Sequence, residues 1–411
     1  KLWKLLMSFV CRVCDSKKIR EILDLGMQPW GNDFIQISEN KKSELYPLNF
    51  VICENCKTSQ INYTIPKEKM FVKHSYMSGT TKTLTSHFQN VGEKIMKLNS
   101  FKKDDYVMDI GGNDGTFLEF FKEKNIKVLN IDSGTEQANL SNKKGIECIN
   151  DFFNEKISSE IIKKYGKAKI IHGSGIFFHL EDLKSVFKGI KNVLNNNGSL
   201  VAEFIYLPSM IKNLAFDQIY HEHLLYYSLH SFQKLLDQFD LEITNAELFA
   251  IHGGSCVVQV NHKADNMAVS QNTKELFSLE KKEGFLDFKV YEDFSSKVLS
   301  LKKDMVDLIN KIKKDNKKIY ALGAPVKGTT LLNFMEFNED ILDCAVEVNK
   351  HKFNTFYPGT KIPVLNQDEV EDPDYYLFLS WNFKNEIISK MSNYVEKGGK
   401  FIIPFPKVEV Q

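Results

Sequence analysis

The 411-residue sequence lacks the features that mark several large classes of protein. No apolar run approaches the ~18–20 residues that are needed to span a bilayer. Its 54 basic and 53 acidic residues leave a formal net charge of +1, so it has no overall electrostatic attraction for nucleic acid or for an anionic membrane surface. Seven cysteines are too few for a disulfide scaffold in a chain of this length. We therefore expect a cytoplasmic protein.

The sequence does contain enough apolar material for more than one core. Hydrophobic residues make up 43% and charged residues 26%, which is typical of globular proteins and excludes wholesale disorder. At ~100–200 residues per domain, the length predicts two to four domains. Changes of pattern along the chain divide it into three, at residues 1–75, 76–265 and 266–411.

Four of the cysteines form two C-x-x-C pairs, Cys11 with Cys14 and Cys53 with Cys56. Four thiolates arranged as two knuckles can close a tetrahedron around Zn²⁺, and a small lobe with little core needs such a staple. The protein would then fill all four ligand positions, so we expect the zinc to be structural. Thiols without a metal are the alternative.

From about residue 101 the pattern alternates between strands and helices. The predicted strands lie at residues 106–110, 128–132, 169–172 and 199–204. Helices are expected from about Thr116 and over residues 183–194. This repetition is typical of an α/β fold with a parallel doubly wound sheet. Two adjacent strands at 241–250 and 256–260, joined by a His-Gly-Gly turn at 252–254, predict antiparallel pairing at one edge of the sheet.

The last third of the chain combines a long helix with a second α/β unit. Apolar residues recur at three- and four-residue steps, which predicts an amphipathic helix. They are Tyr291, Phe294, Val298, Leu301, Met305, Leu308 and Ile312. The α/β unit has a glycine loop at 323–328 before a helix from Thr329. Its strands are expected at 318–322, 341–348, 375–380 and 401–403.

A glycine-rich loop, Asp109-Ile110-Gly111-Gly112-Asn113-Asp114-Gly115, closes a strand and opens a helix. Glycines let the backbone turn tightly and approach a ligand, and a helix N-terminus offers free amide groups. Asp132 ends the next strand, where nucleotide-binding folds hold ribose hydroxyls. The spacing is not the G-x-G-x-x-G of dinucleotide enzymes. It looks more like the loop with which class I methyltransferases hold S-adenosylmethionine (SAM), plain turn chemistry being the alternative.

The sharpest local signal is Tyr220-His221-Glu222-His223, which is followed by Tyr226 and Tyr227. A lone histidine is usually structural, but two histidines, a glutamate and a tyrosine together favour proton transfer or metal binding. No third metal ligand is evident at helical or strand spacing. We therefore favour a general base with partners that orient it.

These motifs, in this order, resemble the SAM-dependent sugar C-methyltransferases, which act on nucleotide-linked 4-ketosugars in deoxysugar biosynthesis. The resemblance runs nearly end to end. It implies an N-terminal zinc-binding region, a central methyltransferase (Rossmann-like) fold and a C-terminal Rossmann-like α/β region. The other matching segments are residues 74–79, 252–255, 323–328, 358–360 and 381–382.

The resemblance also implies roles for matched positions. The catalytic residues would be Tyr76, Tyr220, Glu222 and His223, with His223 as the base. SAM would be bound by Asp109, Gly111, Asn113 and Gly115, with its ribose at Asp132. The substrate, a nucleotide-diphosphate ketosugar, would meet His221 and Lys327. Lys327 lies in a glycine loop before a helix, where a diphosphate is readily bound, although a solvated surface lysine is the alternative.

The sequence departs from the family pattern at two positions of the SAM site. The family usually has Glu where this chain has Asp132, whose side chain is one methylene shorter. It also commonly has Asn in the segment that here reads Ser174 to His179, so the SAM contact of that amide is not expected here.

The expected reaction can proceed on these residues without a metal. A carbon beside a ketone becomes nucleophilic when a base removes its proton, and His223 is the expected base. Tyrosine hydroxyls can then stabilise the enolate. A SAM-dependent sugar O-methyltransferase would use the same base on a hydroxyl and is the first alternative. A zinc-stapled binding module with an inactive methyltransferase fold is the second.

Overall fold

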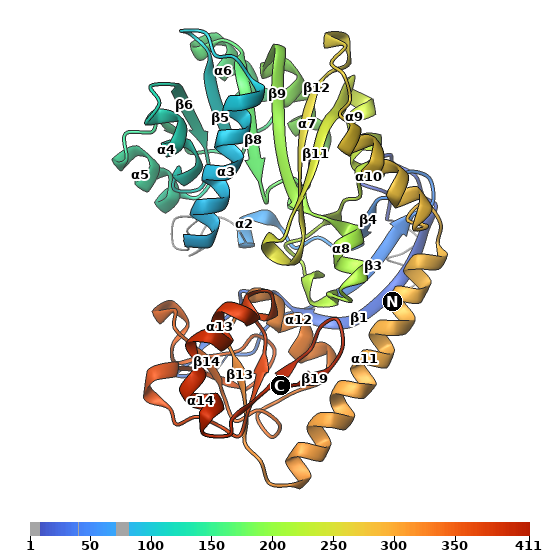
Figure 1. The fold of residues 1–411 in the computed structure, drawn as a ribbon, viewed down its shortest axis with the longest axis vertical. Helices are drawn as coiled ribbons and strands as arrows, with labels where there is room; N and C mark the ends of the chain where they lie inside the picture. The colour runs from blue at the N-terminus through green and yellow to red at the C-terminus, as the bar shows by residue number, and fades with distance from the viewer. Residues whose placement is uncertain (1–8, 40, 71–81) are drawn as a thin grey trace.

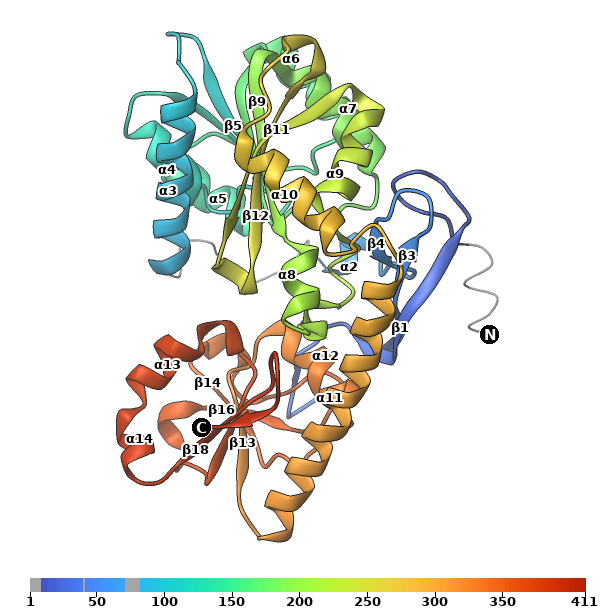
Figure 2. The same cartoon turned by 45° about the vertical axis from the view of Figure 1, so that its right-hand side comes forward.

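Three β-sheets organise the molecule, one in each of three lobes (Figure 1). The computed structural model describes residues 9–39, 41–70 and 82–411. The N-terminal lobe has a four-stranded sheet, the central lobe a seven-stranded sheet and the C-terminal lobe an eight-stranded sheet. Figure 2 shows the N-terminal strands beside the central sheet, above the C-terminal lobe.

The N-terminal lobe is built on two antiparallel strands, β1 (Ile19–Pro29) and β3 (Leu45–Cys53). β3 is buried along most of its length, as its apolar sequence requires. The short strand β4 (Ser59–Ile61) pairs with β3. The fourth strand, β10 (Leu225–Tyr226), comes from the central lobe and pairs with β4. The N-terminal sheet therefore fixes the chain directly after residues 220–223.

The central sheet has the strand order β11-β12-β9-β8-β5-β6-β7. Its strands are β5 (Tyr106–Ile110), β6 (Lys127–Ile131), β7 (Cys148–Ile149), β8 (Ala168–Ser174), β9 (Leu194–Ile205), β11 (Leu241–Phe249) and β12 (Ser255–His262). Strands β5 to β9 run parallel, whereas β12 is antiparallel to both β9 and β11. The predicted parallel sheet with an antiparallel edge is confirmed.

Helices cover both faces of the central sheet, and the sequence of the strands explains why. Neighbouring residues of a strand point to opposite faces. Val107 and Ile170 face α3 (Lys82–Leu98) and α4 (Thr116–Lys122). Met108 and Ile171 belong to the core on the other face, with α6 (Glu155–Tyr165) and α7 (Leu183–Val193). All four strand side chains are fully buried, so both faces must be apolar.

The C-terminal sheet has the order β19-β18-β17-β13-β14-β16-β15-β2. Its strands are β13 (Ile319–Leu322), β14 (Ala345–Glu347), β15 (Thr355–Phe356), β16 (Pro363–Asn366), β17 (Tyr375–Phe378), β18 (Lys400–Ile403), β19 (Glu409–Val410) and β2 (Ile35–Gln36) of the N-terminal lobe. The strand expected at 341–348 is confined to β14. The backbone N–H of Leu342 instead donates to the Asn338 carbonyl at 2.9 Å in a turn.

The helix α11 (Lys289–Lys314) connects the central and C-terminal lobes (Figure 1). Its predicted apolar stripe is confirmed except at one position, since Ile309 is fully buried and Leu308 only half-buried. A step of four residues after Met305 keeps the stripe on the core face, because a turn of helix holds 3.6 residues. Among the described helices, none has the length and apolarity that a bilayer crossing requires.

We expect Ile309→Ala to destabilise the protein much more than Leu308→Ala. Truncating the fully buried Ile309 leaves a cavity and costs ~2–5 kcal/mol, whereas the half-buried Leu308 loses less contact. Urea denaturation of both variants measures the difference. An equal loss of stability in the two variants would contradict the observed difference in burial between Ile309 and Leu308.

Candidate active site and zinc centre

The four cysteines of the two C-x-x-C pairs meet in the N-terminal lobe. Their sulfur atoms all lie within 4.8 Å of one another, and among the described residues every cysteine is free of a disulfide. The Cys11 and Cys56 sulfurs are 3.5 Å apart, and those of Cys14 and Cys53 are 3.6 Å apart. A tetrahedral zinc ion with bonds of about 2.3 Å needs sulfurs about 3.8 Å apart. The cluster therefore fits zinc.

Polar groups around the cluster complete the metal site. The Gln60 side-chain amide donates to the Cys11 sulfur at 3.2 Å, and the Asn55 amide donates to the Cys14 sulfur at 3.5 Å. The Thr58 hydroxyl lies 3.2 Å from the Cys56 sulfur, where it can donate to a thiolate. Such contacts stabilise the charge of bound thiolates. Four protein ligands leave no open position, so the zinc is structural.

The glycine loop lies where β5 ends, at the edge where the parallel strands of the central sheet leave their carboxyl ends. Its backbone turns through positive φ at Gly111, Asn113 and Gly115, with values of 69°, 53° and 79°. A Cβ at Gly111 would lie 3.1 Å from the side chain of Ile176. The loop thus packs closely against the segment that follows β8.

Two aspartates support the glycine loop from the side of the sheet: Asp132 directly after β6 and Asp109 within β5. Asp132 accepts from the backbone N–H groups of Asn113 and Gly134, both at 2.8 Å. Asp109 is buried and pairs with His172 Nδ1 at 2.8 Å. The structure thus brings Asp132 to the loop, whereas Asp109 lies beneath it. Their contacts with SAM stay predictions.

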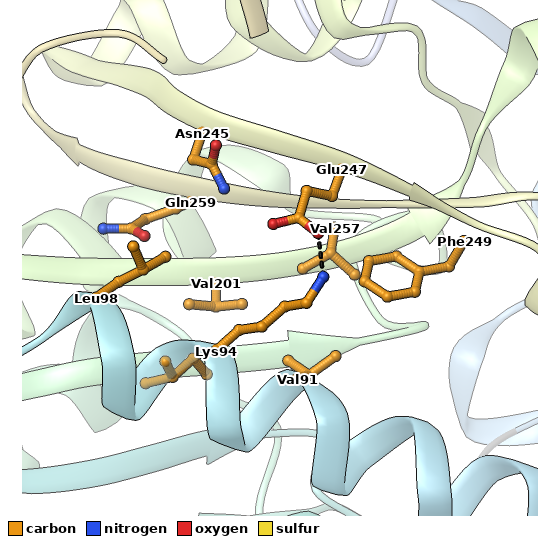
Figure 3. A pocket seen from close by; sticks show the side chains of 10 residues that line it. Val91, Lys94, Leu98, Val201, Asn245, Glu247, Phe249, Val257 and Gln259 are labelled. Atoms are coloured by element: carbon orange, nitrogen blue, oxygen red, sulfur yellow. Dashed lines mark hydrogen bonds and ion pairs between the residues drawn. The ribbon is translucent and has the colours of Figure 1, made fainter. Parts of the chain in front are cut away.

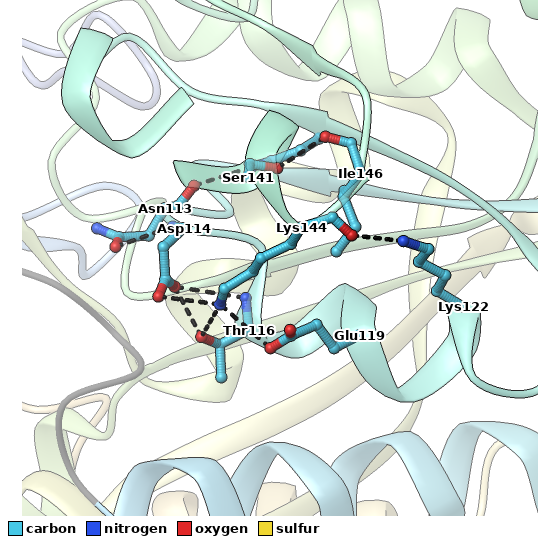
Figure 4. Close-up of polar contacts among 9 residues, drawn as sticks. Asn113, Asp114, Thr116, Glu119, Lys122, Ser141, Lys144 and Ile146 are labelled. Carbon is cyan, nitrogen blue, oxygen red and sulfur yellow. Dashed lines mark hydrogen bonds and ion pairs between the residues drawn. The ribbon is translucent and has the colours of Figure 1, made fainter. Parts of the chain in front are cut away.

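The start of α4 is fixed by the polar contacts drawn in Figure 4. Asp114 accepts from the Thr116 hydroxyl at 2.7 Å. Lys144 reaches the carboxylates of Asp114 at 3.2 Å and Glu119 at 3.1 Å. Gly115 at the N-cap position provides no side-chain cap, and Asp114 Oδ1 lies 3.4 Å from the backbone N of Thr116 at the first position of the helix. These contacts therefore fix the end of the glycine loop to the start of α4.

His223 is buried in the segment before β10 and has a defined tautomer. Its Nδ1 lies 3.0 Å from the Gln218 carbonyl oxygen, which can only accept, so Nδ1 carries the proton. In a neutral imidazole, Nε2 is then the acceptor. The rings of Tyr220 and Phe178 pack against it, with ring-centre distances of 3.9 and 4.5 Å.

Burial sets the charge of His223. It lowers the pKa of His223 well below its ordinary value, and the nearby His179 and His252 lower it further, while the Gln218 carbonyl opposes the shift. The imidazole therefore stays neutral at physiological pH, which is the form that a general base needs.

His179 is a member of this cluster that the sequence analysis missed. Its ring lies 5.1 Å from the His223 ring, and its Nδ1 contacts the Glu222 carbonyl oxygen. The segment from Ser174 to His179 leads from the glycine loop to the base, since Ile176 packs on Gly111 and Phe178 on His223. The position of this segment directly after β8 was the sequence signal that could have identified it as part of the site.

Glu222 is held by the N-terminal lobe. Its Oε1 accepts from the Trp30 indole N–H at 2.7 Å and from the Asn32 amide at 2.8 Å. Burial raises the pKa of Glu222, while Trp30, Asn32 and the cationic Lys352 oppose that rise. Neither Trp30 nor Asn32 was identified from the sequence.

His221 and Tyr76 are two further residues that the sequence predicts for the site. His221 is fully buried, donates from Nε2 to the Pro47 carbonyl at 3.2 Å and packs edge-on against Tyr46, so its described contacts lie in the N-terminal lobe. Burial lowers its pKa to about 4. Tyr76 lies outside the described residues. A substrate contact by His221 and a catalytic role for Tyr76 both stay predictions.

Lys327 lies where the C-terminal lobe meets the central lobe. It lies in the first turn of α12 (Val326–Phe334), donates to Asn382 Oδ1 at 2.6 Å and lies 4.0 Å over the Trp381 ring. The Trp381 indole N–H donates to Asp217 at 2.7 Å, near the segment of the base. Burial lowers the pKa of Lys327 to about 8, against the opposing effect of Asp217.

A pocket between α3 and the antiparallel edge of the central sheet is shown in Figure 3. Its walls are mostly apolar, including Val91, Val201 and Val257, and an ion pair between Lys94 and Glu247 crosses it. The glycine loop after β5 and the segment of residues 220–223 before β10 lie on other elements.

Three family models match consecutive parts of the chain. The "Putative zinc binding domain" matches residues 11–71, the "Methyltransferase domain" residues 85–246, and the "C-methyltransferase C-terminal domain" residues 250–406. The C-methyltransferase NovU of Streptomyces niveus is 27% identical over 403 residues, which are 97% of this chain and 96% of NovU.

The fold and the site define a SAM-dependent methyltransferase with a structural zinc centre. The matched models and the NovU relationship specify it further: in all three parts the chain is similar to C-methyltransferases.

Solved structures resemble this chain over part of its length. A SAM-dependent methyltransferase of Anabaena variabilis has 15% identity and a TM-score of 0.35, and covers 42% of this chain and 83% of its own. The PH0226 protein of Pyrococcus horikoshii has 15% identity and a TM-score of 0.36, over 48% of this chain and 99% of its own.

We expect purified protein to hold one zinc ion per chain and Cys53→Ser to lose it, because a serine hydroxyl does not ionise at neutral pH to replace the thiolate. Elemental analysis measures the zinc content. Cys148→Ser, which changes a half-buried cysteine outside the cluster, is the control and should keep the ion. Wild-type protein without zinc would overturn the assignment.

We expect Gly111→Val to abolish SAM binding in calorimetry, because the new side chain would meet Ile176 and fill the space over the loop. Gly284→Val is the matched control: Gly284 also has a positive φ, of 82°, but no atom lies within 4 Å of its Cβ position. The control should bind SAM normally. Normal affinity in the Gly111 variant would place the cofactor elsewhere.

Proposed function

We propose that this methyltransferase adds a methyl group to the carbon next to the ketone, C3, of a nucleotide-linked 4-keto-deoxysugar. The product would enter deoxysugar biosynthesis for surface polysaccharides or natural products. The single observation that supports this most is the buried, neutral His223, whose Nε2 is an acceptor. Methylation of carbon requires removal of a proton from carbon, and the NovU relationship points to the same class of reaction.

In this proposal, Nε2 of His223 takes the proton from the ring carbon beside the ketone. The electron pair left behind forms an enolate, and its carbon bonds to the transferred methyl group. SAM, when bound, supplies that methyl on a positively charged sulfur, which leaves as a neutral thioether. A well-placed base contributes roughly 10²–10⁴ to the rate. A lowered pKa keeps the base free of protons but weakens it, so the enolate must be stabilised by its surroundings.

Tyr220 is the described residue best placed to stabilise the enolate. Its ring lies against His223, so its hydroxyl can donate toward the oxygen on which negative charge develops. We assign Tyr76 the same part, on the basis of the family resemblance. Glu222 would organise the sugar, since a carboxylate accepts hydrogen bonds from sugar hydroxyls.

The cofactor and the nucleotide would occupy opposite sides of the base. SAM would lie over Gly111, Asn113 and Gly115, with its ribose at Asp132. The segment after β8 joins this loop to His223, which would bring the methyl group to the reacting carbon. Lys327 would meet the diphosphate from the C-terminal lobe after releasing Asn382.

We expect His223→Ala to lower turnover by ~10²-fold or more with saturating substrate and SAM, while SAM affinity stays near normal. The variant should also lose exchange of the ring proton with deuterated water, measured with the demethylated cofactor in place of SAM. His262→Ala is the control, because His262 ends β12 and donates to the Leu194 carbonyl, away from the cluster. Near-wild-type turnover of His223→Ala would exclude His223 as the base.

A further inference from the structure

The carboxylate of Glu222 is held by two donors that lie about 190 residues earlier in the chain, in the N-terminal lobe. Trp30 and Asn32 both donate to the same oxygen, Oε1, at 2.7 and 2.8 Å. Among the described residues, Oε2 makes no hydrogen bond. One oxygen is therefore anchored, and the other can accept from a substrate hydroxyl. Hydrogen bonds to an ionised group are about twice as strong as those between neutral groups.

The loop that carries these donors is fixed by the C-terminal lobe. A Cβ at Gly31 would lie 2.5 Å from the Val326 side chain and 3.2 Å from its carbonyl oxygen, so only glycine fits there without a shift. The Gly31 carbonyl accepts from the Thr329 hydroxyl at 3.0 Å. Residues 30–32, which we name the junction loop, are thus clamped between α12 and Glu222.

The polar and titratable groups around Glu222 come from all three lobes. Lys352 of the C-terminal lobe is the nearby cation, and its Nζ donates to the Ala324 carbonyl at 2.6 Å. His179, His221 and His223 lie on the central lobe, and burial lowers the pKa values of His221 and His223 so that both stay neutral. The described neighbours that stabilise the charge of Glu222 are therefore Trp30, Asn32 and Lys352.

We propose that Trp30 and Asn32 are positioning residues of the methyl-transfer site, which hold Glu222 ionised and aim its second oxygen at a hydroxyl of the substrate. The zinc-stapled lobe is then part of the active site and not only a structural attachment. This inference rests on the proposed function, because it assigns Glu222 to the sugar. Trp30 and Asn32 act through Glu222 and need not touch the substrate.

A double-mutant cycle on turnover tests this role. Trp30→Phe keeps the ring and removes the donor, and we expect kcat/KM to fall about 10-fold or more, since hydrogen bonds to charged groups contribute about 1.5–3 kcal/mol. In a Glu222→Ala background the same change should cost less than about 2-fold, because its target is gone. Tyr63→Phe, in the same apolar cluster as Trp30, is the control and should leave kcat/KM unchanged.

The pH profile gives a readout that a purely structural role would not change. Losing a donor raises the pKa of Glu222, so the carboxylate is protonated at higher pH and the acid side of the kcat/KM profile moves upward. Asn32→Asp should move it in the same direction, since a like charge replaces the amide donor. Neither shift should occur in the Glu222→Ala background. A pH profile that does not move in either single variant would overturn the proposal.

Thermal unfolding without substrate separates this inference from the proposed function. The losses in melting temperature from Trp30→Phe and Glu222→Ala should be less than additive if the side chains interact. Additive losses, or additive losses in turnover, would overturn the positioning role while leaving the proposed function intact. A wild-type enzyme that methylates no ketosugar would overturn the proposed function, and the coupling in melting temperature would still decide whether the contact exists.

Discussion

The rest of the site depends on the hydrogen bonds that join β10 to β4. Gln60 pairs with Leu225 in that ladder, and the Ile61 N–H donates to the Leu224 carbonyl at 3.1 Å. The same Gln60 donates from its side chain to the Cys11 sulfur of the zinc centre. A short path of backbone and side-chain contacts therefore runs from the metal to the residue after His223. These contacts connect the zinc centre to the segment that carries His223.

The segment from Asp217 to His223 is stabilised by donors from both neighbouring lobes. Trp381 donates to Asp217, and the Thr330 hydroxyl donates to the Ile219 carbonyl at 2.9 Å. Trp30 donates to Glu222 from the other side. Buried carbonyls and carboxylates without partners would cost several kcal/mol, so this segment reaches its conformation only when the three lobes are assembled. The same burial keeps His223 neutral.

Much of the fold could be predicted from the sequence because its signals are local. The strand at 106–110, the glycine loop and the two C-x-x-C pairs each occupy a short stretch, and the structure has each where the pattern indicated. The contacts of Glu222 could not be predicted in this way, since Trp30 and Asn32 are separated from it by most of two lobes. No periodicity relates residues that tertiary packing alone brings together.

The division into 1–75, 76–265 and 266–411 stays a prediction for a related reason. β10 lies in the second segment of the sequence but in the sheet of the first, and β2 lies in the first segment but in the sheet of the third. Exchange of two-residue strands leaves no compositional trace.

The central claim, that a base on this shared segment directs methylation to carbon, is tested most directly by incubating the enzyme with a nucleotide-linked 4-ketosugar and SAM carrying a ¹³C-labelled methyl group. Carbon NMR of the product should show the labelled methyl bonded to the ring carbon beside the ketone. A methyl group bonded to oxygen would contradict the account.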